Sequence, residues 1–214
     1  MRGLQPLISK FLQTGLLAPC NSPCKTPILA VKKLEGSYRL AQALRAINQA
    51  VVPIHLIAPN PYNLPSQIPI QTQWYSVLDL KDAFFCIPAH SNSQFLFAFE
   101  WRDPNTKYAQ QLTCTVLPQG FRDSPHLLGQ ALPKDLSSLT LENRGCLLQY
   151  LDDLLICSPE RLTSDSNTIL VLKHLAEQGY QGSPAKAQIT SQQVTFLGLV
   201  LTLGRGILLL TTEH

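Results

Sequence analysis

The chain has 214 residues, enough for one large domain or two small ones, and 45% of them are hydrophobic. This share excludes a chain that is disordered throughout, because it can supply a sizeable buried core. Charged residues make up only 14%, and a net charge of +3 indicates nucleic-acid binding only if the charges cluster on one face.

The six cysteines lack the paired spacing of a zinc site or of a disulfide framework. We therefore expect reduced thiols in the core of an intracellular protein. Lys10 and Gln13 interrupt the N-terminal apolar residues, which excludes a signal peptide. No segment is long and apolar enough to span a membrane, so we expect no membrane partner.

The N-terminal part of the chain predicts short elements separated by prolines. Leu7, Ile8 and Phe11 fall at helical spacing, and Gly15 follows as a stop signal. The expected elements are a helix over Pro6–Thr14, a strand over Ile28–Lys33, a turn at Glu35–Ser37, a helix around Ala43–Ala50 and an ordered connector over Pro53–Pro69.

From Trp74 onward, apolar runs alternate with helical patterns. We place Ile169, Leu172, His174 and Leu175 near one face of the second long helix. The expected elements are a strand at Tyr75–Leu80, hairpin strands at Phe95–Trp101 and Tyr108–Thr115, a helix at Ser124–Leu136, strands at Leu147–Tyr150 and Leu154–Cys157, a helix at Ser164–Gln178, and a strand at Val194–Leu201 that turns at Leu203–Gly206 into another.

Without the hairpin insertion, the order of elements is strand, helix, strand, strand, helix, strand. This order is that of a split βαβ, or ferredoxin-like, α+β fold. In that topology the first strand and the central hairpin are neighbours in one sheet. Asp79 is therefore expected beside Asp152 and Asp153, although 73 residues separate Asp79 from Asp152.

These three carboxylates lie within apolar runs, where a charge is costly unless it is paired or binds a cation. Asp152 and Asp153 alone could be turn residues that point to water, but this reading does not explain Asp79. Two Mg²⁺ ions, or Mn²⁺ in their place, would account for all three and would suit phosphoryl transfer. Because neighbouring strand residues point in opposite directions, we expect Asp79 and Asp152 to be the firmer ligands and Asp153 the more peripheral one.

Several motifs resemble those of reverse transcriptases of the gammaretroviral type, in the same order along the chain. The resemblance runs from about Leu7 to Leu210. The motifs that carry it are VKKLEGSYRL, VLDLKDAFFCIPAH (Val77–His90), FAFEWRDP, QQLTCTVLPQGF, LPQGFRDSP (Leu117–Pro125), Tyr150-Leu151-Asp152-Asp153 and FLGLVL.

The resemblance implies an RNA-directed DNA polymerase in which Asp79, Asp152 and Asp153 bind the metal ions. Deoxynucleoside triphosphates and an RNA or DNA template–primer would be its substrates. Phe84 would lie beneath the incoming sugar, where its ring would clash with a 2′-hydroxyl. The other matching positions are Gln119, which lines the nucleotide pocket, Lys33 and Arg39, which hold the triphosphate, and Phe196-Leu197-Gly198, which forms the primer grip.

Each of these positions also has a structural reading. Phe84 could belong to the core, and Phe196–Gly198 could be part of a core strand. Lys33 and Arg39 could be solvated charges beside a turn.

The resemblance also implies a division into subdomains. Residues 1–73 would form part of the fingers and a connector. Residues 74–214 would form the palm, with a fingers hairpin inserted near 95–115. Neither a thumb nor an RNase H domain is expected in this chain, so a protein partner would have to supply them.

Four positions depart from the family pattern. They are Ala43, where relatives carry an acid, Cys114, where Trp is usual, Val116, where Arg is frequent, and Pro133, within a helix. Such departures are typical of an endogenous retroviral element. The alternative is therefore a catalytically silent remnant that binds only nucleic acid or a protein. A generic RNA-binding module is disfavoured, because the sheet strands offer few aromatic residues for stacking on bases.

Overall fold

The computed structural model describes residues 2–32, 36–54, 60–203 and 206–209. The chain folds into two compact units, Met1–His55 with Phe84–Leu127, and Leu56–Ala83 with Leu128–His214. Each unit is therefore assembled from two separate stretches of the chain. None of the described helices is long and apolar enough to cross a bilayer.

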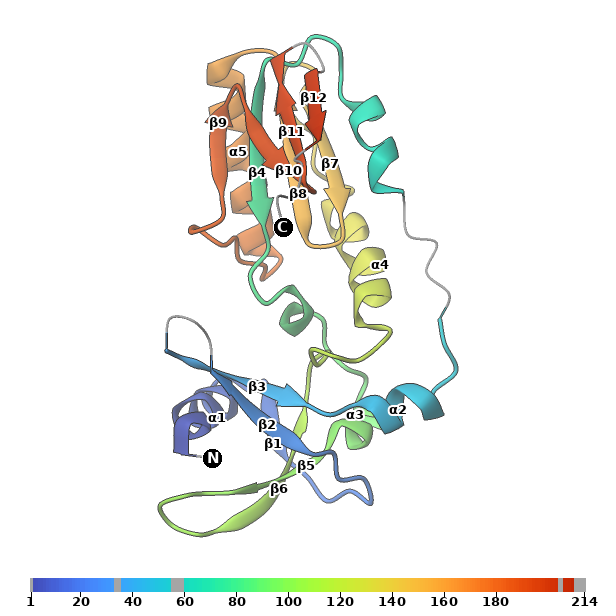
Figure 1. The fold of residues 1–214 in the computed structure, drawn as a ribbon, viewed down its shortest axis with the longest axis vertical. Helices are drawn as coiled ribbons and strands as arrows, with labels where there is room; N and C mark the ends of the chain where they lie inside the picture. Colours follow the sequence, from blue (N-terminus) through green and yellow to red (C-terminus); the bar gives the residue numbers. More distant parts are fainter. Residues whose placement is uncertain (1, 33–35, 55–59, 204–205, 210–214) are drawn as a thin grey trace. The chain divides into compact units, whose positions relative to one another are not determined.

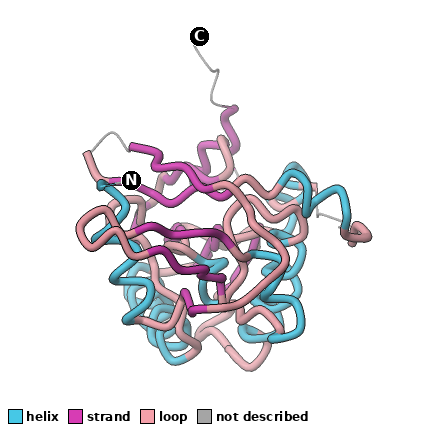
Figure 2. The backbone as a smooth tube through the Cα atoms, turned by 90° about the horizontal axis from the view of Figure 1, so that it is seen from below, coloured by secondary structure: helices cyan, strands magenta, loops and turns pink. Residues whose placement is uncertain are grey.

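The first unit consists of short antiparallel strands and short helices. β6 lies between β1 and β5 in one sheet, while β2 and β3 form a separate hairpin. Its elements are α1 (Gln5–Gln13), β1 (Leu17–Pro19), β2 (Ile28–Lys32), β3 (Tyr38–Gln42), α2 (Arg45–Ala50), α3 (Ser91–Gln94), β5 (Phe99–Arg102) and β6 (Ala109–Cys114). Figure 2 shows the helices, strands and loops along the whole backbone.

The core of the first unit explains why its helices form where they do. Ile8 of α1 is 1% exposed, and Phe99 and Leu112 on the β5–β6 pair are completely buried. The predicted N-terminal helix is confirmed, and Gly15 follows its end with a φ of 73°. Ile47 of α2 also packs on this core.

One element of the first unit was not predicted, and the start of another was wrong. β3 was not predicted, because its mixed sequence lacks strict alternation, and its pairing with β2 determines it. Phe95–Phe97 forms a 3-10 turn instead of starting a strand, and Phe97 is buried against Phe121. Lys33, the last residue of the expected strand, lies outside the described residues.

The connector contains two short 3-10 turns, at Pro61–Asn63 and Pro65–Gln67. Leu64 and Ile68 are buried in the core of the second unit. The connector is therefore anchored by apolar contacts at its second half, while residues 55–59 lie outside the described part.

The second unit has the predicted split βαβ topology. Its four-stranded sheet has the order β7–β8–β4–β9, and every neighbouring pair is antiparallel. Its elements are β4 (Trp74–Asp79), β7 (Cys146–Tyr150), β8 (Asp153–Ser158), α5 (Arg161–Glu177), β9 (Gln188–Ser191), β10 (Val194–Phe196), β11 (Leu199–Thr202) and β12 (Gly206–Leu209). The unit also includes the C-terminal part of α4, a helix that runs over Ser124–Leu136. Figure 1 shows α5 behind this sheet and β10–β11 in front of it.

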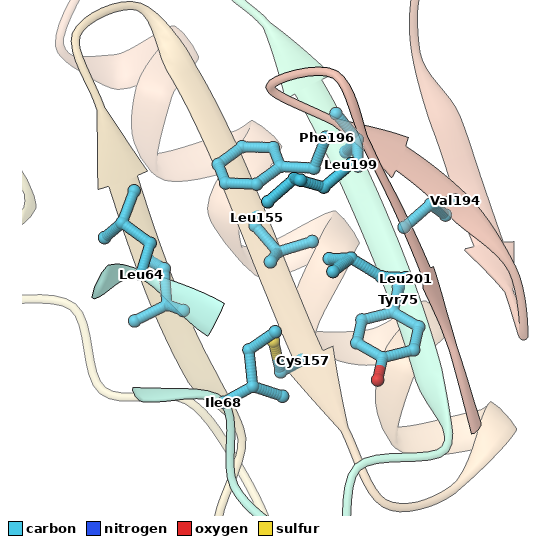
Figure 3. Packing of buried hydrophobic residues seen from close by; sticks show 11 residues of the cluster. Leu64, Ile68, Tyr75, Leu155, Cys157, Val194, Phe196, Leu199 and Leu201 are labelled. Carbon is cyan, nitrogen blue, oxygen red and sulfur yellow. The ribbon is translucent and has the colours of Figure 1, made fainter. Parts of the chain in front are cut away.

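One face of the sheet carries the main apolar core of this unit. Tyr75 and Val77 of β4 and Leu155 and Cys157 of β8 all point to this face, because alternate residues of a strand share a face. They pack against buried residues of β10 and β11, including Phe196 (Figure 3). Burial raises the pKa of the Cys157 thiol, consistent with a cysteine that acts as a small apolar side chain.

The expected single strand over Val194–Leu201 was wrong. Phe196 pairs with Leu199, so the chain reverses at Leu197-Gly198, and both turn residues have positive φ values, 51° and 77°. Two positive φ values are the mark of a two-residue hairpin turn. The strand that completes the main sheet is β9, which was not predicted.

The predicted apolar face of α5 was right for Leu175, which is 1% exposed, and wrong for Ile169. Ile169 is 66% exposed, while the buried face includes the polar residues Asn167 and Thr168. Their polar groups are satisfied: Thr168 Oγ1 donates to Ser76 Oγ at 2.8 Å, and Asn167 Nδ2 donates to Ser158 Oγ at 3.3 Å. Because these partners are on the sheet, polar contacts act together with the buried apolar residues Val171 and Leu175 in determining which face is buried.

Pro133 lies inside α4 and is exposed. Its ring nitrogen has no hydrogen to donate to the carbonyl four residues earlier, and its ring crowds that carbonyl. α4 nonetheless continues to Leu136.

We expect the Pro133→Ala variant to be more stable by about 1–3 kcal/mol, because it restores one helical hydrogen bond. The free energy of unfolding in urea measures this gain. Pro125→Ala is the matched control, because a proline in the first turn of a helix replaces no intrahelical donor and its removal should gain nothing. Equal stability of Pro133→Ala and the unsubstituted chain would contradict the expectation.

Candidate active site

Asp79, Asp152 and Asp153 come together at one end of the β4–β8 strand pair. Asp79 ends β4, and Asp153, the first residue of β8, is its direct antiparallel partner. Asp152 lies in the turn between β7 and β8, and its carbonyl accepts the N–H of Leu80 at 3.0 Å. The register therefore brings these backbones together from distant positions in the sequence, and Asp153, not Asp152, lies opposite Asp79.

The turn before β8 is tight. Leu151 has a φ of 52°, in the left-handed region that costs an ordinary L-residue about 1–2 kcal/mol. Tyr150 and Asp153 are paired across this two-residue connection. The strained turn thus holds Asp152 directly beside the end of the sheet.

Lys186 is the cation at this site. Its Nζ donates to Asp79 Oδ2 at 2.9 Å, and its side chain is 67% exposed. The hydrogen bond to Asp79 and the nearby carboxylates raise the pKa of Lys186. The backbone of this segment is tied to β4, because Ser183 N–H donates to the Asp79 carbonyl at 2.8 Å.

Asp153 is in an environment that disfavours its charge. Burial, followed by the charges of Asp152 and Asp79, raises its pKa to about 6, and Lys186 opposes this shift. Three carboxylates share one ammonium group here, so the site has an excess of negative charge that a cation would offset.

The donor chemistry of the three aspartates fits a hard divalent cation. Carboxylate oxygens are the ligands that Mg²⁺ uses in proteins, usually one or two of them together with water and substrate phosphates. In the described part of the chain, no three His, Cys, Asp or Glu side chains gather closely enough to hold an ion as they stand. Asp79 is instead turned toward Lys186, so ion binding requires its side chain to reorient.

The comparisons with known proteins decide the family. The family model described as reverse transcriptase (RNA-dependent DNA polymerase) matches residues 31–201. The chain belongs to the reverse transcriptase family.

Known relatives agree with this assignment. The chain is 49% identical over 205 residues to the Gag-Pol polyprotein of Koala retrovirus, covering 95% of the chain and 12% of the polyprotein. It is 48% identical to the Pol polyprotein of Feline endogenous virus ECE1, of which it covers 20%. The chain therefore spans only a small part of the relatives that it matches.

Solved structures show the same fold. The foamy viral protease-reverse transcriptase in complex with double-stranded DNA superposes with a TM-score of 0.82 at 28% identity, over 99% of this chain and 35% of that one. The same viral protein in complex with an RNA/DNA hybrid gives a TM-score of 0.80, also at 28% identity, over 99% and 27% of the two chains.

The remaining predicted nucleotide contacts of this reverse transcriptase domain lie in the first unit. Arg39 is exposed on β3, opposite Val31 of the hairpin. Phe84 is half-buried in the 3-10 turn Ala83–Cys86, and Gln119 is exposed just before Gly120. Lys33 lies outside the described residues.

The predicted primer-grip residues form the β10–β11 turn. Phe196 is 3% exposed and packs in the core, whereas Leu197 is half-buried and Gly198 is exposed. Phe196 therefore has the structural role that was considered beside the functional one, and the two roles are compatible.

The fold accommodates the other unusual positions. Cys114 is buried, which raises the pKa of its thiol to about 12, and its Sγ lies 3.7 Å from Gln42 Oε1. Val116 forms an isolated bridge with Pro88. Ala43 is exposed, and its N–H donates to the Pro27 carbonyl at 2.8 Å.

Sequence reasoning missed Lys186, which lies 107 residues after Asp79. An exposed lysine between two small residues carries no local signal. The pairing of β9 with β4, together with the backbone hydrogen bond from Ser183 to Asp79, brings it to the carboxylates.

With a chelator present to remove divalent ions, we expect Asp153→Asn to raise the free energy of unfolding at pH 8 by about 1 kcal/mol. This magnitude allows for the screening of a half-exposed group by solvent. A carboxyl whose pKa rises on folding favours folding at low pH, and this contribution is lost as the pH rises through about 6. The advantage of the variant should therefore vanish below about pH 4. Urea unfolding at several pH values measures it.

Asp103→Asn is a control of opposite sign. The N–H groups of Thr106 and Asn105 donate to Asp103 and lower its pKa, so its substitution should destabilise the protein at pH 8. A constant difference between Asp153→Asn and the unsubstituted protein at every pH would contradict the expectation for Asp153.

Proposed function

We propose that this chain is an RNA-directed DNA polymerase domain, which extends a primer 3′-hydroxyl with deoxynucleoside triphosphates on an RNA or DNA template. The observation that carries the proposal is the pairing of Asp79 with Asp153, next to Asp152, at one end of the sheet. Together with family membership, this arrangement supports a role for all three carboxylates in nucleotidyl transfer.

We further propose that Asp79, Asp152 and Asp153 hold two divalent ions, Mg²⁺ or Mn²⁺. Such ions would lower the pKa of the attacking hydroxyl and neutralise charge on the leaving pyrophosphate. The carboxylates would fix the ion positions, and the excess negative charge at Asp153 supports this role. Lys186 would release Asp79 as the ions bind, because ammonium and metal compete for one carboxylate.

We assign the first unit to the fingers and the second unit to the palm. In the first unit, Lys33 and Arg39 would bind the triphosphate, Gln119 would line the nucleotide pocket, and the Phe84 ring would exclude a 2′-hydroxyl. Arg39 and Gln119 are exposed, which supports roles in contacting ligands. In the second unit, Phe196–Gly198 would contact the primer through the β10–β11 turn.

The distribution of charge supports nucleic-acid binding. The first unit has ten Lys and Arg against four Asp and Glu, a net charge of +6, and the second has seven against ten, a net charge of −3. The overall charge of +3 is therefore the sum of a basic unit, which is suited to binding phosphate, and an acidic unit, which is suited to binding cations.

We expect Mg²⁺-dependent primer extension by the unsubstituted chain on a primed RNA template. The Asp152→Asn/Asp153→Asn double variant should lose roughly a thousandfold or more of this activity, because both carboxylates lose their charge. Asp165→Asn on α5 is the matched control and should retain activity. Absence of extension by folded, unsubstituted protein would contradict the polymerase proposal and favour a silent domain, while leaving family membership intact.

We expect Lys186→Met to bind Mn²⁺ about two- to fivefold more tightly than the unsubstituted chain, because an exposed ion pair is worth up to ~1 kcal/mol. Electron paramagnetic resonance of free Mn²⁺ measures the affinity without requiring catalysis. Lys173→Met, at an exposed position of α5, is the control for the loss of one positive charge and should have little effect. Weaker or unchanged binding by Lys186→Met would show that the ammonium does not compete with the ion.

A further inference from the structure

The loop between β6 and α4 is held in one conformation by its two ends and its centre. Leu117 N–H donates to the Ile87 carbonyl at 3.0 Å, and Ser124 Oγ donates to the Pro118 carbonyl at 3.1 Å. At the centre, the Phe121 ring packs edge-on against Phe97, with ring centroids 5.2 Å apart. These contacts leave the stretch around Gln119 and Gly120 exposed.

Asn48 of α2 clamps this exposed stretch with both halves of its amide. Its Nδ2 donates to the Gly120 carbonyl at 2.9 Å, and its Oδ1 accepts the N–H of Arg122, also at 2.9 Å. Gly120 has a φ of 93°, a conformation that other residues rarely adopt. The Asn48 amide therefore binds the loop backbone at the position where Gly120 adopts a left-handed conformation.

Further hydrogen bonds hold Asn48 and Arg122 in place. Asn48 N–H donates to the Leu44 carbonyl at 2.8 Å, and Leu44 is only 3% exposed. Arg122 adds a second connection, because its Nη2 donates to the Val51 carbonyl at 3.0 Å at the end of α2. The loop is therefore fixed to a helix that packs on the core of its unit.

The chemistry of the clamp requires a side-chain amide. One partner is a carbonyl, which needs a donor, and the other is an N–H, which needs an acceptor. Aspartate keeps the acceptor but has no donor, and alanine has neither. Each substitution therefore removes a defined part of the clamp.

Gln119 depends on this arrangement. Its side chain is exposed and makes no hydrogen bond to any residue in the described part of the chain, so its position follows from the backbone on either side. We propose that Asn48 is a positioning residue, which holds the Gln119–Gly120 loop in the conformation that presents Gln119 to the incoming nucleotide. This inference rests on the proposed polymerase function.

Single-nucleotide incorporation on a primed template tests the role of Asn48. For Asn48→Ala we expect the KM for the deoxynucleoside triphosphate to rise about tenfold with kcat changed less than twofold, because loosening the loop weakens ground-state binding. Asn48→Asp should show an intermediate or equal rise in KM. A merely structural role would lower the amount of folded enzyme and leave KM unchanged.

Amide hydrogen exchange, resolved by residue with NMR, tests the clamp without catalysis. The Arg122 amide should exchange about tenfold faster in Asn48→Ala than in the unsubstituted chain, but should stay protected in Asn48→Asp, which keeps the acceptor. Asn105→Ala is the matched control. Its Nδ2 donates to Gln5 Oε1 at 3.2 Å at an exposed turn of the same unit, so it also loses a surface hydrogen bond.

The outcomes separate two failures. If the unsubstituted chain incorporates no nucleotide, the proposed function fails and the role of Asn48 in nucleotide binding fails with it. If that chain incorporates nucleotide, either of two results overturns only the role of Asn48. One is an unchanged KM for Asn48→Ala. The other is that Asn48→Ala matches Asn105→Ala in both the KM and the exchange rate of the Arg122 amide. A raised KM with faster Arg122 exchange supports the proposal.

Discussion

The antiparallel pairing of β4 with β8 is the constraint on which the candidate active site depends. Six consecutive residue pairs, from Trp74↔Ser158 to Asp79↔Asp153, define its register. A slip of one residue would move every side chain of one strand to the opposite face, and Asp79 would no longer face Asp153. Since Tyr75, Leu155 and Cys157 are buried, the apolar core excludes that slip. The packing of the sheet therefore also fixes the geometry of the carboxylates.

Apolar residues are buried on both faces of this sheet, and the face toward α5 also makes side-chain hydrogen bonds. The face with Tyr75 and Leu155 is covered by apolar residues of β10 and β11. The opposite face buries Leu154 and Ile156 of β8. It also meets α5 through Ser76, Thr168 and Asn167, whose hydrogen bonds are geometrically specific. Apolar burial drives association of the layers, while the polar contacts restrict α5 to one orientation.

The sequence was sufficient to predict elements with strong local patterns. The split βαβ order and the meeting of Asp79 with Asp152 and Asp153 followed from apolar runs and topology. β3 and β9 could not be predicted, because their pairing partners and not their own periodicity determine them. The polar part of the buried face of α5 could not be predicted either, because Thr168 and Asn167 are typical surface residue types and their partners on the sheet are not known from the sequence.

Residues that act through tertiary contacts were the hardest to find. Lys186 and Asn48 are ordinary surface residue types in sequence, yet one pairs with Asp79 and the other clamps the loop at Gly120. The segment of Lys186 is tied to β4 by a backbone hydrogen bond from Ser183 to Asp79. By contrast, α2 is tied to the Gly120 loop through the side chains of Asn48 and Arg122. Aspartates within apolar runs can be recognised in the sequence, because burying a charge costs free energy. A positioning residue carries no such cost. The same physics therefore makes the three carboxylates conspicuous in the sequence and gives no local signal for Lys186 and Asn48, which act through tertiary contacts.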